Sequence, residues 1–144
     1  MIGLVIVTHG RLAVEFRSAL EHVVGPQSQL EAICIGSDDD DAASRGRILE
    51  AVERVDSGGG VAILTDMFGQ TPSNLAISMM NGWNVEILAG INLPMLIKLA
   101  QVRAKCALAE ATAAAKQAGR TYIVSAAAVL KRNTASSGGH EAVR

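Results

Sequence analysis

The stretch that most constrains the fold is Ile2 to Val7, an apolar run rich in β-branched side chains at the start of the chain. A run of this kind is typical of a strand buried on both faces in a parallel sheet. Thr8, His9 and Gly10 follow at once, and the next residues have helical spacing. His9 is therefore expected at the carboxyl end of a central strand, the edge where α/β sheets collect ligands and reactive groups.

The rest of the chain alternates between apolar runs and amphipathic stretches. Further strands are predicted at 30–35, 61–65 and 85–89, with a weaker one at 122–124. Helices are predicted over 12–23, after the acidic loop 38–41 with a buried face at 48–55, over 72–80 and over 94–118. This alternation predicts a doubly wound α/β fold with an open sheet of four parallel strands. Right-handed crossovers favour the strand order 2-1-3-4, which places the first and third strands side by side.

Asp66 ends the third predicted strand, as His9 ends the first. In the order 2-1-3-4 the two side chains become neighbours, so a hydrogen bond between them is expected. A carboxylate on one ring nitrogen fixes the tautomer and leaves the other nitrogen free as a nucleophile. Gly10 allows close approach to the backbone, and the helix starts after His9 and Gln70 add free amides. Such surroundings favour a phosphoryl group.

The sequence also indicates how the next helix begins. Thr71 is a residue type that caps helices, and Pro72 has the fixed φ suited to the first helical turn. The acidic run Asp38 to Asp41 lies before another predicted helix. Consecutive carboxylates point in different directions, so we interpret this run as a solvated face and expect no metal site.

Composition excludes several functions. With 13 Lys and Arg against 14 Asp and Glu, the net charge is -1 and no basic stripe is present for nucleic acid. Cys34 and Cys106 form no CxxC pair, which favours reduced core cysteines. No basic leader precedes the first apolar run, and no segment approaches the roughly 20 apolar residues of a membrane span. We expect a cytoplasmic protein with one domain over 1–130 and a mobile polar tail over 131–144.

Three blocks of sequence occur in order: Thr8-His9-Gly10 with Ala13, then Thr65-Asp66-Met67-Phe68-Gly69-Gln70-Thr71-Pro72-Ser73-Asn74, then Gly90-Ile91-Asn92-Leu93-Pro94-Met95. Together they resemble the mannose-type enzyme IIA domain of the bacterial phosphoenolpyruvate-dependent sugar phosphotransferase system. The likeness covers about residues 1–125. One departure is Gln70, which stands where the family usually has a second glycine.

The resemblance implies a phosphoryl carrier. His9 would receive phosphate from the phosphocarrier protein HPr, and Asp66 would orient it. Gly10, Gly69 and Thr71 would lie against the phosphoryl group, with no cofactor and no metal. The phosphate would pass to a separate IIB component or serve as a regulatory signal, with membrane contact only indirect, through a permease complex.

The resemblance also implies a homodimer. In the family a last, antiparallel strand exchanges between subunits, and Tyr122 to Val124 would be that strand here.

Two other classes fit part of the pattern. A receiver-like signalling module would carry its phosphate on Asp66, but receivers need acidic residues after the first strand to hold magnesium, where this chain has Thr8-His9-Gly10. A non-catalytic regulatory binding domain is the other alternative. A nucleotide-binding module is disfavoured, because neither GxGxxG nor GxxxxGK[ST] occurs.

Overall fold

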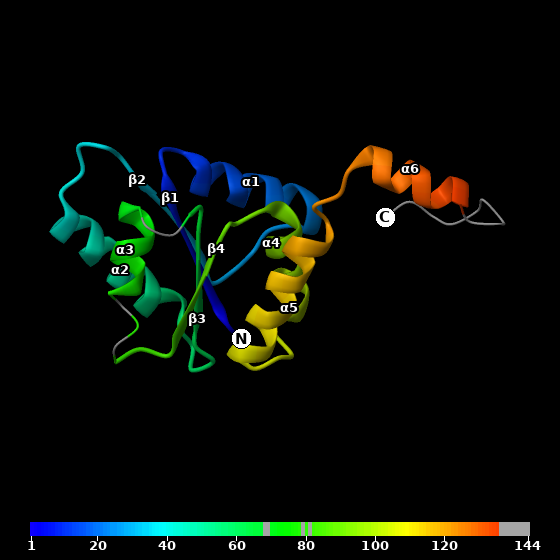
Figure 1. Ribbon diagram of the computed structural model, residues 1–144. Helices are drawn as coiled ribbons and strands as arrows, with labels where there is room; N and C mark the ends of the chain where they lie inside the picture. Colours follow the sequence, from blue (N-terminus) through cyan, green and yellow to red (C-terminus); the bar gives the residue numbers. More distant parts are fainter. Residues whose placement is uncertain (68–69, 79, 81, 136–144) are drawn as a thin grey trace.

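The computed structural model describes residues 1–67, 70–78, 80 and 82–135. Helices cover both faces of a single sheet, as Figure 1 shows. In chain order the elements are β1 (Gly3–His9), α1 (Leu12–Val24), β2 (Leu30–Ile35), α2 (Asp41–Val55), β3 (Val61–Thr65), α3 (Thr71–Ile77), β4 (Val85–Ala89), α4 (Leu93–Val102), α5 (Leu108–Thr121) and α6 (Ala126–Ala135).

The sheet has four strands in the order β2-β1-β3-β4, and every pair is parallel. The predicted doubly wound fold and strand order are thus confirmed. Val7 of β1 lies opposite Thr65 of β3, so the residues that follow them, His9 and Asp66, emerge at the same edge of the sheet. Both central strands are almost fully buried, which accounts for their continuous apolar runs.

Side chains alternate between the two faces of each strand and build two cores. Leu4, Ile6 and Leu64 join the core beneath α1, α4 and α5. Val5 and Ile63 point the other way, into the core beneath α2 and α3. No helix within the described ranges is long and apolar enough to cross a membrane.

The helix predicted over 94–118 is two helices, α4 and α5, joined by a turn at 103–107. Neither glycine nor proline marks this break. Arg103 is the C-cap residue of α4, and its side chain is buried at 3% exposure. The guanidinium donates to the carbonyl oxygens of Ile2 and Gln29 at 3.3 and 3.1 Å, and also to the carbonyl of Ser28 and the Gln27 side chain. These partners are distant in sequence, so helical periodicity alone missed the break.

The carboxyl-terminal part also differs from expectation. The single chain forms no strand at 122–124; this segment links α5 to α6, a helix that the sequence did not predict. Pairing of 122–124 with a second copy remains a prediction. The boundary placed after residue 130 falls inside α6, and 136–144 of the predicted tail lie outside the described residues.

Candidate functional site

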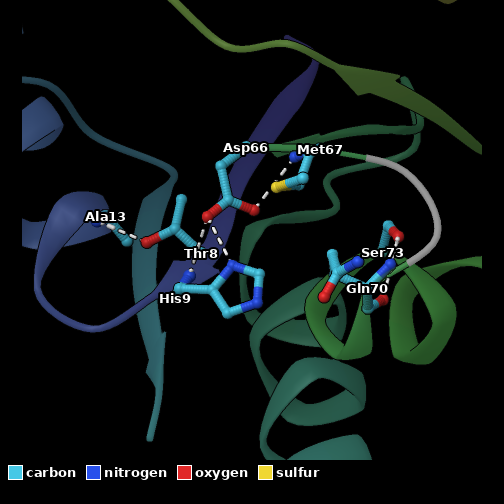
Figure 2. Close-up of polar contacts among 7 residues, drawn as sticks. All are labelled: Thr8, His9, Ala13, Asp66, Met67, Gln70 and Ser73. Carbon is cyan, nitrogen blue, oxygen red and sulfur yellow. Dashed lines mark hydrogen bonds and ion pairs between the residues drawn. The ribbon is translucent and has the colours of Figure 1, made fainter.

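His9 and Asp66 meet at the carboxyl ends of β1 and β3 (Figure 2). Nδ1 of His9 lies 2.7 Å from Oδ2 of Asp66, and the backbone N–H of His9 donates to the same oxygen at 3.0 Å. The other oxygen, Oδ1, accepts from the backbone N–H of Met67 at 3.0 Å. The carboxylate is 14% exposed, whereas the imidazole is 44% exposed. A sheltered, fixed carboxylate therefore holds an accessible ring, and the expected hydrogen bond between the two side chains is present.

The charge of Asp66 follows from these contacts. Burial alone would raise the pKa of Asp66, but hydrogen bonds from the His9 side chain and backbone, attraction to the His9 ring and the Met67 N–H lower this pKa overall. An ionised carboxylate beside Nδ1 favours the tautomer with the proton on Nδ1. The lone pair of Nε2 is then free.

The ring opens into a hollow of about 380 Å³. Nε2 lies on the side of the ring away from Asp66 (Figure 2). Gly10 and Thr71, two of the predicted phosphoryl-binding residues, line the hollow with His9, whereas Gly69 lies outside the described residues. The remaining lining comes from the loop after β2: Ile35, Gly36, Ser37, Asp39 and Asp41.

Thr8 positions the turn between β1 and α1, a role that the sequence analysis missed. Its buried hydroxyl accepts from the backbone N–H of Ala13 at 2.7 Å, because Arg11 at the start of α1 supplies no side-chain cap. Gly10 has a φ of +53°, in the left-handed region that favours glycine. Its N–H donates to the carbonyl of Ile35 at 3.0 Å. A small hydroxyl residue shortly before an uncapped helix was the available signal.

Helix α3 begins differently from the prediction. Gln70, not Thr71, is the N-cap residue. Ser73, the third helical residue, completes a capping box: its Oγ accepts from the Gln70 N–H at 3.4 Å and donates to the Gln70 carbonyl at 3.0 Å. Thr71 is the first helical residue, and within the described chain its hydroxyl is not used for capping. Thr71 lines the hollow together with His9 and Gly10.

The acidic loop belongs to the same hollow, which the sequence analysis did not anticipate. Asp39 accepts from the backbone N–H of Gly36 at 2.7 Å, and Asp40 caps α2 by accepting from Ala43 N–H at 3.0 Å. Asp39 and Asp41 line the rim that faces His9. The β2 strand brings them there because it runs parallel to β1 and ends at the same edge.

Residues 90–95, the third of the sequence blocks, make backbone hydrogen bonds to the end of β3 next to Asp66. Gly90 N–H donates to the Asp66 carbonyl at 3.2 Å, and Ile91 N–H donates to the Thr65 carbonyl at 3.1 Å. Asn92 then caps α4 through Met95 N–H at 3.0 Å. The end of β3 is thus fixed on both sides, which holds Asp66 in register with His9.

Comparison with known proteins agrees with this geometry. A solved EIIA component of the phosphotransferase system from Streptococcus agalactiae superposes with a TM-score of 0.81 at 23% identity, covering 89% of this chain and 99% of that one. The mannose/sorbose-specific IIA subunit from Enterococcus faecalis gives 0.77 at 23% identity, with coverages of 86% and 93%. These likenesses show the fold of a phosphotransferase-system IIA domain.

Sequence comparison is more specific. The chain is 26% identical over 109 residues to the fructose-specific EIIA component of the phosphotransferase system of Bacillus subtilis, which covers 75% of each protein. The family model EIIA-man, described as the PTS system fructose IIA component, matches residues 3–116. The chain therefore belongs to the EIIA-man family, and the resemblance to mannose-type IIA domains is confirmed. It is a sugar phosphotransferase-system component.

Proposed function

We propose that the chain is a phosphoryl carrier that accepts phosphate from phospho-HPr on Nε2 of His9. The observation that carries this proposal is the 2.7 Å contact between Nδ1 and Asp66 on a ring that is 44% exposed. Nδ1 is occupied, so the ring has one free nitrogen. That nitrogen faces open space into which a donor protein can bring a phosphoryl group.

The chemistry needs few groups. The Nε2 lone pair attacks phosphorus in line with the donor's N–P bond, which breaks and returns its electron pair to the donor's ring nitrogen. As the Nε2–P bond forms, positive charge develops on the His9 ring, and the Asp66 carboxylate stabilises it across the Nδ1 proton. Thr71 and Gly10 line the hollow where the phosphoryl oxygens would lie.

The onward path is part of the same proposal. His9 would pass its phosphate to a separate IIB component, or the phosphorylated chain would act as a regulatory signal, in either case in the cytoplasm. The Bacillus subtilis relative is named as fructose-specific, and the Enterococcus faecalis subunit as mannose/sorbose-specific. A sugar of this class is the corresponding proposal for this chain.

Phosphorylation with purified components tests the site. We expect phosphoenolpyruvate, enzyme I and HPr to place an acid-labile, base-stable phosphoryl group on the chain. His9→Ala should remove the label, whereas His22→Ala, an exposed histidine on α1, should keep it. An acyl phosphate on Asp66 would support a receiver-like module instead, and no label at all would support a non-catalytic binding domain.

We further propose a homodimer formed by strand exchange. Strand β4 is a sheet edge, and a groove of about 640 Å³ runs between it and α5. Tyr122, Ile123 and Val124 expose 57%, 74% and 54% of their surface, and α6 extends away from the sheet (Figure 1). Apolar residues beside an open edge suit pairing with a second copy. Deleting 122–124 should lower the sedimentation coefficient to that of a monomer.

A further inference from the structure

The free edge of β4 exposes a defined set of backbone groups. Val61 N–H donates to the carbonyl of Asn84 at 3.0 Å, which sets the phase of the ladder between β3 and β4. In a parallel ladder, alternate residues direct their amides and carbonyls to opposite sides. Val85, Ile87 and Ala89 therefore face away from β3, and Ile87 is the middle of the three.

The outward amide of Ile87 is already occupied. It donates to Oε1 of the neighbouring residue, Glu86, at 2.8 Å. The carboxylate thus takes the place that a carbonyl of an added strand would take. Glu86 is half-buried, lines the groove beside β4, and forms none of the ion pairs among the described residues, although Lys116 and Arg120 of α5 line the same groove.

We propose that Glu86 guards this edge: its carboxylate must leave the Ile87 amide before residues 122–124 of a second copy can pair with β4. The inference rests on the homodimer proposed above. The occupant is a second copy because Tyr122 to Val124 are exposed apolar residues with no strand partner in the described chain.

Guarding has an energetic consequence. In the single chain Ile87 N–H donates to a charged acceptor, and charge-assisted hydrogen bonds are stronger than those to a neutral carbonyl. When a strand is added, the Ile87 N–H exchanges its bond to the Glu86 carboxylate for a bond to a carbonyl of the added strand. The carboxylate then moves toward water or toward Lys116 and Arg120. Glu86 therefore opposes pairing, and its removal should favour the dimer.

Sedimentation equilibrium of the full chain tests whether Glu86 weakens dimerisation. We expect Glu86→Ala to tighten dimerisation about three- to tenfold, the scale of one hydrogen bond at a partly exposed position. Glu86→Gln, which keeps an acceptor without the charge, should give a smaller gain. Glu53→Ala, which removes an exposed carboxylate from α2, should leave the constant unchanged. Unchanged or weaker dimerisation of Glu86→Ala relative to Glu53→Ala would overturn the proposal.

Amide hydrogen exchange tests the contact of Glu86 with the Ile87 amide independently of the homodimer. In chains from which only 122–124 are deleted, Ile87 N–H should exchange slowly with Glu86 present and at least tenfold faster in Glu86→Ala. Fast exchange in both chains would overturn the guard while leaving the homodimer standing. If the parent chain and all variants stay monomeric, the homodimer fails and the guard fails with it.

Discussion

Oδ2 of Asp66 accepts two hydrogen bonds from the same residue, one from the His9 backbone at 3.0 Å and one from its ring at 2.7 Å. The carboxylate therefore fixes both the end of β1 and the orientation of the imidazole. Asp66 thus contributes both to the packing of the sheet and to the site. Substitutions that keep the shape of its side chain and remove its charge can test the second contribution separately.

Replacing the charge alone is the first test. Asp66→Asn keeps the size of the side chain but removes the negative charge that stabilises the phosphorylated ring. We expect phosphorylation by phospho-HPr to slow about 100- to 1000-fold, the scale of losing one group that stabilises developing charge. Rapid-quench kinetics would measure it. A rate equal to that of the parent chain would contradict the role of Asp66.

The pH dependence of stability follows from the same carboxylate. Contacts with His9 lower the pKa of Asp66 in the folded state below its ordinary value of 3.8. Its stabilising contribution is present above the unfolded value and is lost as pH falls through the folded one. We expect the free energy of unfolding to fall more steeply below about pH 4 in the parent chain than in Asp66→Asn. Urea unfolding at several pH values would show parallel curves if this were wrong.

A substitution of Thr71 tests whether a residue that lines the hollow contributes to phosphorylation. Because its hydroxyl does not cap α3, Thr71→Val should leave stability within about 0.5 kcal/mol. It should slow phosphorylation several-fold, since a donor near the phosphoryl oxygens is lost, and Thr71→Ser should restore most of the rate. Paired rate and unfolding measurements give the answer. A valine variant that transfers phosphate normally would remove Thr71 from the site.

A substitution of Arg103 tests how much its buried hydrogen bonds contribute to stability. Arg103→Met leaves the carbonyls of Ile2, Ser28 and Gln29 without this donor. Ile2 is buried, whereas Ser28 is exposed and the Gln29 carbonyl keeps the Leu4 N–H as a donor. Leaving one buried acceptor unsatisfied is costly, so we expect a loss of about 1–3 kcal/mol in the free energy of unfolding. Lys105→Met, at an exposed position in the same turn, serves as the control. Equal stabilities of the two variants would contradict the inferred role of Arg103.

Several features were predictable because they depend on local pattern. The apolar runs at Ile2–Val7 and 61–65 marked the buried strands, and their alternation with helical stretches predicted the order that brings His9 to Asp66. The start of α3 was only partly predictable. The residue types favoured Thr71 as the N-cap, but the N-cap is Gln70, and Ser73 completes the capping box.

The sequence by itself determined the parallel sheet and the positions of His9 and Asp66 at its edge, because side-chain periodicity and strand ends are local properties. Tertiary structure decided the break between α4 and α5, where Arg103 bonds to carbonyls from the other end of the chain. It also decided the contact of Glu86 with the open edge of β4. Such contacts depend on which groups remain unpaired after the elements pack, and that information appears in no single stretch of residues.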